Sequence, residues 1–215
     1  MKKYKCIVWD WNGTLLDDRD VCVKAMNTLL KRRKLPELTL ERYLEIFDFP
    51  VINYYNQLAF PDRDSYEDLS QEFIEAYDAH LITATLHRDA IRTLEKVKSA
   101  GVRQVSLSAS MQKRLEEQLK LYRVDHYFSP ILGIADIYGH GKADIALQWL
   151  PGSGFHPSEI LLCGDTAHDA EVAMAMGCDC LLIAQGHQSR ARLEKAGVPL
   201  ADSLKEAAMH MDDHI

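Results

Sequence analysis

Aspartates follow short apolar runs in this sequence, at positions suited to binding a cation. Asp10 directly follows the apolar run 6–9, and Asp165 follows the run that ends at Cys163, with Asp169 four residues later. Carboxylates gathered at one point repel one another, and a divalent ion relieves that repulsion. Oxygen ligands in a tight cluster favour Mg²⁺. Each aspartate alone could instead cap the helix that follows it, but the set of three favours a magnesium site.

A hydroxyl and an ammonium group extend this pattern. Ser108 follows the apolar run 102–107, and Lys142 lies in the glycine-rich segment 139–142. Both groups suit a phosphoryl group beside a cation, because phosphoryl transfer is catalysed mostly by positioning and by neutralising charge on the non-bridging oxygens. The sequence therefore predicts phosphate chemistry at the metal site.

Strands that alternate with helices are expected to position these residues. The apolar runs 6–9, 102–107, 160–163 and 180–184 indicate strands buried on both faces, as in a parallel sheet, and helical periods lie between them. Gly177 and Gly197 stand where a helix end favours a left-handed residue. We expect a doubly wound, Rossmann-like α/β core whose ligands bind beyond the carboxyl ends of its strands.

Residues 18–86 break this alternation and predict a small α-helical cap domain, so that the core comprises 1–17 and 87–215. Helical periods cover 25–30, 40–47 and 69–80, and no convincing strand is found between residues 21 and 86. Its apolar and aromatic side chains could line a ligand pocket, but we interpret most of them as the core of the insertion. The residues concerned are Phe47, Phe49, Tyr54, Tyr55, Phe60, Phe73 and Tyr77.

Composition limits the class of protein. The 215 residues, 47% of them apolar, suffice for one domain with an insertion and a full core. A formal net charge of −7 without a basic patch argues against nucleic-acid binding. No apolar run is long enough to span a bilayer or to form a signal peptide. Five cysteines without a repeated CxxC spacing indicate a reducing compartment, so we expect a cytoplasmic protein.

The order of these motifs resembles the haloacid dehalogenase superfamily of hydrolases. The segment 10–15, Asp-Trp-Asn-Gly-Thr-Leu, is similar to the first motif of that superfamily, and the segment 164–169 is similar to the fourth. Ser108 and Lys142 take the places of the short second and third motifs. A helical insertion directly after the first motif is similar to the cap of the phosphoglycolate phosphatase-like branch.

The resemblance implies a phosphatase, a phosphoric monoester hydrolase, that acts on a small phosphorylated metabolite. Asp10 would be the nucleophile and would form an aspartyl-phosphate intermediate. Asp10, the backbone carbonyl of Asn12, Asp165 and Asp169 would bind Mg²⁺, the last directly or through water.

The same resemblance assigns the phosphate-binding groups. Ser108 and Lys142 would hold the phosphoryl oxygens, and Lys142 would also keep Asp10 ionised. The backbone amides of the turn through Gly13 and Thr14 are further candidate donors.

Residue 12 departs from the pattern of the superfamily. Its phosphatases carry an aspartate there, which protonates the leaving oxygen and later activates water, whereas this chain has Asn12. An amide cannot shuttle a proton at neutral pH, and such assistance is worth about 10² to 10⁴ in rate. Activity is therefore expected to be reduced, unless the leaving group needs no proton, as in an acyl phosphate, or His168 or His140 supplies it.

Two alternatives stay open. The chain could be a catalytically damped protein that binds a phosphorylated metabolite or regulates a partner. It could also be a phosphonate hydrolase, but that chemistry needs a Schiff-base lysine in the cap, and Lys24, Lys31 or Lys34 cannot be assigned to it. Arg19, Lys24 and Arg42 could meet an anionic substrate, although we interpret them as a solvated helix face. The sequence specifies neither the substrate nor the oligomeric state.

Overall fold

A six-stranded parallel sheet forms the centre of the protein in the computed structural model, which describes residues 4–138, 141–212 and 214–215. The strands lie in the order β5-β4-β1-β6-β7-β8, and every neighbouring pair is parallel. Their bounds are β1 Cys6–Trp9, β4 Arg103–Met111, β5 Ile131–Ile134, β6 Ile160–Gly164, β7 Asp179–Ile183 and β8 Leu200–Ala201. The expected doubly wound α/β core is confirmed.

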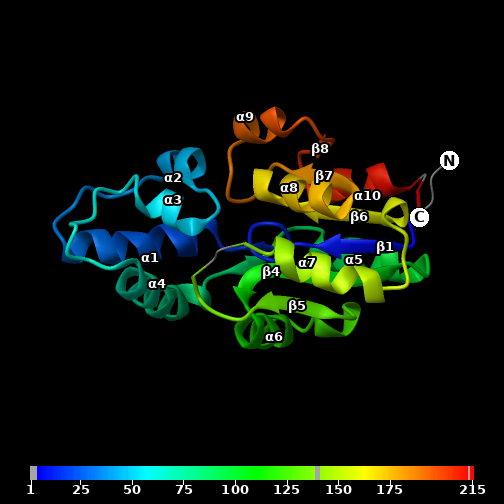
Figure 1. The fold of residues 1–215 in the computed structure, drawn as a ribbon, viewed down its shortest axis with the longest axis horizontal. Coiled ribbons are helices and arrows are strands. Elements are labelled where there is room, and N and C mark those ends of the chain that lie inside the picture. Colours follow the sequence, from blue (N-terminus) through cyan, green and yellow to red (C-terminus); the bar gives the residue numbers. More distant parts are fainter. Residues whose placement is uncertain (1–3, 139–140, 213) are drawn as a thin grey trace.

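Helices cover both faces of this sheet (Figure 1). Side chains alternate along β1, so Ile7 and Trp9 pack in one hydrophobic cluster and Cys6 and Val8 in a second. The first cluster includes α5 (Ala90–Ser99), α6 (Gln112–Leu121) and α10 (Leu204–Met211). The second includes α7 (Ala143–Trp149), α8 (Ala167–Met176) and α9 (Arg190–Leu193). Single 3₁₀ turns complete the core at Asp125–Tyr127, Leu150–Gly152, Pro157–Glu159 and Glu194–Ala196.

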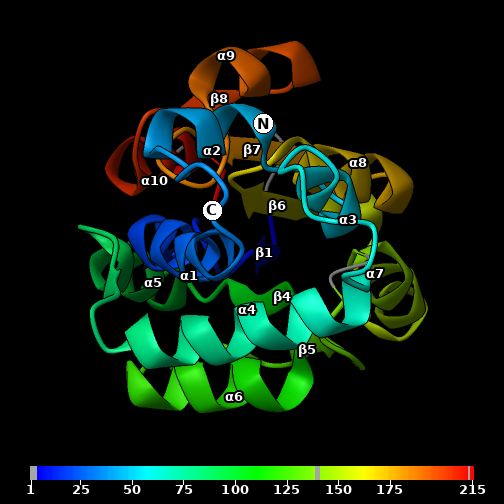
Figure 2. The same ribbon diagram turned by 90° about the vertical axis from the view of Figure 1, so that its left-hand side faces the viewer.

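Four further helices gather at one end of the molecule (Figure 1). They are α1 (Arg19–Arg32), α2 (Leu40–Ile46), α3 (Val51–Tyr55) and α4 (Tyr66–Leu81). Thr39 and Ser65 begin α2 and α4, because their hydroxyl oxygens accept hydrogen bonds from the amides of Arg42 and Asp68. Helix α4 runs beside α1 and also lies near α6, where Arg114 pairs with Asp78 (Figure 2).

Two short strands connect these helices to the core. β2 (Leu16–Asp17) and β3 (Thr85–Leu86) pair in an antiparallel ribbon on either side of α1 to α4. The expectation of no strand between residues 21 and 86 is therefore wrong, because a two-residue strand carries no detectable periodicity. β4 also extends to Met111, beyond the expected end at 107, and its register with β5 shifts there.

Register places the candidate residues at one edge of the sheet. Trp9 pairs with Ser106 of β4 and with Cys163 of β6, so β1 lies between the strands that lead to Ser108 and Asp165. The strand order reverses at β1, which is where open α/β sheets bind ligands. Across the described ranges, helices long and apolar enough to cross a bilayer are absent. Cys6, Cys22, Cys163 and Cys180 are buried free thiols.

Candidate active site

Three buried aspartates meet at the carboxyl ends of β1 and β6. Carboxylate oxygens of Asp10, Asp165 and Asp169 all lie within 4.8 Å of one another. The backbone amide of Asp10 donates to the carbonyl of Cys163 at 2.9 Å, which continues the pairing of the two strands up to the aspartates. The structure thus brings together the three carboxylates that the sequence analysis selected.

Thr14 joins two of these carboxylates. Its hydroxyl lies 2.7 Å from Asp165 Oδ1 and 3.1 Å from Asp10 Oδ2. Gly13 permits this close approach, because its φ is +79° and a Cβ there would collide with the Asp165 carboxylate. The Gly13 amide donates to Leu16 O and to Asp18 Oδ1, so this donor is engaged within the turn.

Asp169 both caps the start of a helix and has an oxygen available for a metal ion. Its Oδ2 accepts hydrogen bonds from the amides of Asp165 and Thr166 and from the Thr166 hydroxyl, which fixes the start of α8. Its Oδ1 is buried, has no hydrogen-bond donor of suitable geometry within the described part of the chain, and faces Lys142 Nζ at 2.7 Å. A buried carboxylate oxygen that lacks a hydrogen-bond donor is suited to act as a metal ligand.

Lys142 is the ammonium group of the cluster. Its Nζ contacts Asp10 Oδ1 and Asp169 Oδ1 and donates to Leu107 O at 3.2 Å. Burial lowers the pKa of Lys142, but the two carboxylates outweigh burial and raise that pKa overall. Lys142 therefore carries its charge, and the sequence correctly placed it beside Asp10.

One ammonium does not balance three carboxylates. Burial raises the pKa of Asp10 far above its usual value against the attraction of Lys142, and burial also raises the pKa of Asp165. Burial raises the pKa of Asp169 as well, but Lys142 and Thr166 lower it overall. With all three ionised, the group would carry two negative charges in excess, and a divalent cation with oxygen ligands fits that arrangement.

Asn12 is held by hydrogen bonds on both sides of its amide. Its Nδ2 donates to Asp18 Oδ2 at 2.8 Å and to the Tyr77 hydroxyl at 3.2 Å. Its Oδ1 accepts from the Ser110 hydroxyl at 2.8 Å, while Ser108 Oγ lies farther away, at 3.4 Å. These contacts fix the orientation of the Asn12 amide, because its NH₂ group donates hydrogen bonds on one side and its oxygen accepts one on the other.

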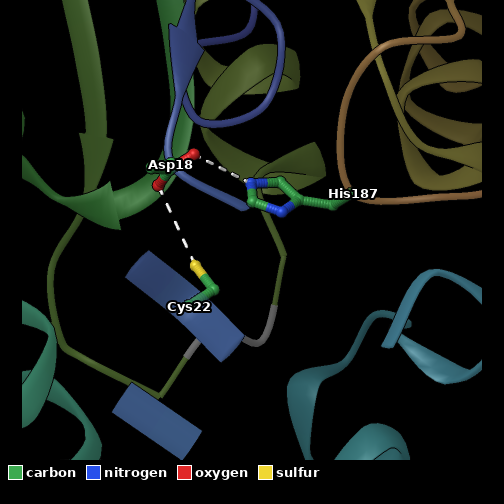
Figure 3. Close-up of side chains that lie close together, drawn as sticks. All are labelled: Asp18, Cys22 and His187. Atoms are coloured by element: carbon green, nitrogen blue, oxygen red, sulfur yellow. Dashed lines mark hydrogen bonds and ion pairs between the residues drawn. The ribbon is translucent and has the colours of Figure 1, made fainter. Parts of the chain in front are cut away.

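Asp18 and His187 form an ion pair that the sequence analysis missed (Figure 3). His187 Nε2 lies 3.1 Å from Asp18 Oδ1, its Nδ1 lies 2.9 Å from the Tyr43 hydroxyl, and its backbone amide donates to Asp165 Oδ2 at 2.6 Å. Burial lowers the pKa of His187, but Asp18 outweighs burial and raises it to about 9. Although burial raises the pKa of Asp18, His187, Tyr77 and Asn12 lower it overall.

The ion pair of Asp18 and His187 belongs to a second group of three potential metal ligands, together with Cys22. Cys22 Sγ lies 3.9 Å from Asp18 Oδ2, and the ligand atoms of Asp18, Cys22 and His187 lie within 4.8 Å of one another (Figure 3). The Asp18 carboxylate is already neutralised by His187 and accepts hydrogen bonds from Gly13, Asn12 and Tyr77. The aspartate cluster, with its excess of negative charge, is therefore the better candidate metal site.

A cavity of about 150 Å³ extends from the aspartates to helices α1 to α4. Asp10, Asn12, Ser108, Lys142 and Asp165 line its inner end. Its other lining is largely aromatic, with Tyr43, Phe47, Phe49, Tyr54, Tyr55, Tyr66, Phe73 and Tyr77. The interpretation of these aromatic residues as the core of the insertion was incomplete, because Tyr54, Tyr55 and Tyr77 are buried in the hydrophobic cluster and also line the cavity.

Other candidates from the sequence do not line this cavity in the described part of the chain. His168 stacks on Phe49 with ring centroids 4.9 Å apart and has Glu171 as its partner. His140 lies outside the described residues. Lys24, Lys31 and Lys34 are exposed, so none stands where a Schiff-base lysine would act. The cations Arg19 and Arg42 pair with neighbouring carboxylates.

Known proteins resemble this chain over most of its length. The family model described as haloacid dehalogenase-like hydrolase matches residues 7–183. The phosphoglycolate phosphatase of Aliivibrio fischeri is 24% identical over 210 residues, which cover 93% of this chain and 89% of that protein. The phosphoglycolate phosphatase of Chromobacterium violaceum is 26% identical over 205 residues, 90% of each chain. A crystal structure described as a predicted phosphoglycolate phosphatase from Haemophilus somnus superposes with a TM-score of 0.81 at 20% identity, over 99% of this chain and 100% of that chain.

Proposed function

Because the chain belongs to the haloacid dehalogenase-like hydrolases, we propose that it is a Mg²⁺-dependent phosphatase of a small phosphorylated metabolite, with Asp10 as its nucleophile. The observation that carries this proposal is the Asp10–Lys142 ion pair at the inner end of a cavity, beside Asp165 and Asp169. The relatives and the family agree with a phosphatase and leave the substrate open.

The residues of the chain divide the reaction between them. Lys142 favours the ionised form of Asp10 against the effect of its burial, and a bound divalent cation would add to that effect. A carboxylate oxygen of Asp10 can then attack phosphorus, and the bond from phosphorus to the leaving oxygen breaks. Thr14 holds the Asp10 carboxylate by its hydroxyl. Water then attacks the aspartyl phosphate, which releases inorganic phosphate and restores Asp10. Ser108 and Lys142 hold the phosphoryl oxygens during both steps.

Asp10, Asp165, Asp169 and the backbone carbonyl of Asn12 would hold the Mg²⁺ ion. When bound, Mg²⁺ supplies neutralisation of the charge on the phosphoryl oxygens. The buried Oδ1 of Asp169 and the excess of carboxylates over ammonium groups support this assignment.

Residues 18–86 act in this proposal as a cap domain that closes over the cavity and excludes water. Contacts between α2 and the segment after β7 support a closed state. The side chains of Gln188 and Arg192 donate to the carbonyl of Phe47 at 3.0 and 2.5 Å, and the amide of Ser189 donates to Leu44 O at 3.1 Å. A cytoplasmic site of action stays a prediction.

A second candidate is a damped protein that binds its phosphorylated ligand with little turnover. Asn12 favours it, because an amide at this position neither donates a proton to the leaving oxygen nor activates water. The two candidates differ in turnover and share the same binding site.

Phosphate release from a panel of phosphate monoesters and acyl phosphates tests the proposal. We expect Mg²⁺-dependent release that chelation abolishes and that Asp10→Asn lowers by at least 10³-fold. Asp62→Asn, the same change at an exposed position, is the matched control and should retain wild-type activity. Mass spectrometry of acid-quenched protein should find a phosphorylated peptide that contains Asp10.

Equal release by the wild type and Asp10→Asn would refute the phosphatase. Saturable binding of a phosphate ester without turnover would support the damped protein instead.

A further inference from the structure

We propose that the site takes the phosphate ester of a phenol, that is, a compact aromatic leaving group without a second anionic group. This inference rests on the proposed phosphatase function and names its class of substrate. Four features of the cavity lead to it: its wall, its charges, its size and Asn12.

The wall that faces the aspartates is a continuous set of aromatic rings. Phe47 and Tyr43 lie 5.6 and 5.7 Å from Tyr54, measured between ring centroids, and Tyr54 lies 5.6 Å from Tyr55. Ring centroids at 4.5 to 7 Å are typical of favourable aromatic pairs. A planar aromatic ligand would join this set, whereas a carboxylate would lose its hydration there without compensation.

The cations that line the cavity, among the described residues, are already paired. Lys142 contacts Asp10 and Asp169, and His187 pairs with Asp18. Arg114 forms a two-pronged ion pair with Asp78. A substrate with a carboxylate beside its phosphate would find no free positive charge to bind it.

Tyr54 supplies one polar group in this wall. Its hydroxyl is buried and lacks a hydrogen-bond partner among the described residues, although burying such a hydroxyl costs about 1 to 3 kcal/mol. A ligand atom that accepts its hydrogen bond would remove that cost.

The size of the cavity limits the ligand. Its volume of about 150 Å³ equals that of an apolar protein cavity known to take up benzene. Because the same space must also hold the phosphoryl group, the leaving group can be no larger than one six-membered ring, and a nucleotide or a sugar with several hydroxyls does not match its apolar wall.

Asn12 favours the same leaving group for a separate reason. Without a proton donor, the leaving oxygen departs as an anion and keeps the electron pair of the broken bond to phosphorus. A phenol has a pKa of about 10, whereas that of water, and of alcohols close to it, is about 16. Phenolate therefore departs without assistance, and it takes its proton later from the water that hydrolyses the aspartyl phosphate.

Three substrates separate these features when kcat/KM is measured with the full chain and Mg²⁺. Phenyl phosphate has the ring and a phenol leaving group, benzyl phosphate has the ring and an alcohol leaving group, and 2-phosphoglycolate has an alcohol leaving group and a carboxylate. We expect phenyl phosphate to exceed benzyl phosphate by about 10²-fold or more, the range of general acid assistance. We expect 2-phosphoglycolate to be the poorest of the three.

Two variants test the wall and the missing acid. Ile74→Arg places a cation in the cavity wall and should lower kcat/KM for phenyl phosphate at least tenfold while raising that for 2-phosphoglycolate. Ile82→Arg, at a position 83% exposed, is the matched control and should change neither. Asn12→Asp should raise kcat/KM for benzyl phosphate more than for phenyl phosphate, because only the alcohol needs a proton.

The outcomes separate this inference from the proposed function. Hydrolysis of 2-phosphoglycolate as fast as or faster than phenyl phosphate would overturn the inference and leave a phosphatase. Hydrolysis of acetyl phosphate but not of phenyl phosphate would do the same, since only the acidity of the leaving group would then matter. If none of these compounds is hydrolysed but another phosphate ester of the panel is, the inference fails and the proposed function stands. If no ester of the panel is hydrolysed, both fail.

Discussion

Replacing Asn12 by aspartate should make the stability of the protein depend steeply on pH. Asn12 Nδ2 lies 2.8 Å from Asp18 Oδ2, so the substitution would put two carboxylate oxygens at hydrogen-bond distance. Two unit charges at that separation repel by about 6 kcal/mol at an effective dielectric constant of about 20. This repulsion corresponds to about four pKa units, so one carboxyl of the pair should stay protonated in the folded protein at neutral pH.

The sign of the effect follows from the protons bound by each state. Above about pH 4 the unfolded variant loses the proton that its folded form retains, so the folded state binds one proton more. The free energy of unfolding of Asn12→Asp should then fall by about 1.4 kcal/mol per pH unit relative to the wild type. At pH 7 the deficit reaches about 4 kcal/mol.

We would measure this difference in unfolding free energy by urea unfolding of the wild type and Asn12→Asp between pH 4.5 and 7.5, with a chelator present. Asn53→Asp, which adds the same charge at an exposed position of α3, should differ from the wild type by a small and nearly constant amount. A deficit for Asn12→Asp that does not change with pH would refute the reasoning, because the two carboxyls would then not share a proton.

Two further changes test the hydrogen bonds of the site. Asp18 raises the pKa of His187 from 6.5 to about 9, although burial alone would lower it. This shift in pKa corresponds to about 3 kcal/mol of stabilisation of the folded protein. This stabilisation is complete below pH 6.5, so the gap in unfolding free energy between the wild type and His187→Gln should shrink as pH rises through 9; a constant gap contradicts the ion pair. Thr14→Val should lower the unfolding free energy by about 1.5 to 3 kcal/mol in urea titrations, because a carboxylate loses a hydrogen bond. A loss no larger than that of Thr83→Val, whose hydroxyl is exposed, would contradict this role.

The sequence predicted the parts of the site that follow long buried strands. Asp10 directly follows one apolar run and Asp165 follows another after a single glycine, and parallel strands bring the residues after them to one edge of the sheet. Asp169 was selected because it lies four residues after Asp165. Lys142 and Ser108 were chosen for their chemistry, and the structure brings Lys142 into contact with Asp10.

Other parts of the site depend on contacts between distant segments. Asp18 has the position and type of a helix cap, but its side chain makes no cap hydrogen bond and instead binds Asn12, Tyr77 and His187. His187 had one available signal, because it follows a glycine just after β7, at the carboxyl end of a parallel strand. Short elements such as β3, β8 and α3 were missed because they contain too few residues to show a period.

His187 contacts both sides of the cavity, and this has a thermodynamic consequence. Its amide holds Asp165 beside the candidate metal site, while its ring contacts Asp18 and Tyr43 of α2. A change in the position of α2 would therefore be coupled to the position of Asp165 in the candidate metal site. By reciprocity, an occupant of the cavity strengthens metal binding by the same factor by which the metal strengthens binding of that occupant.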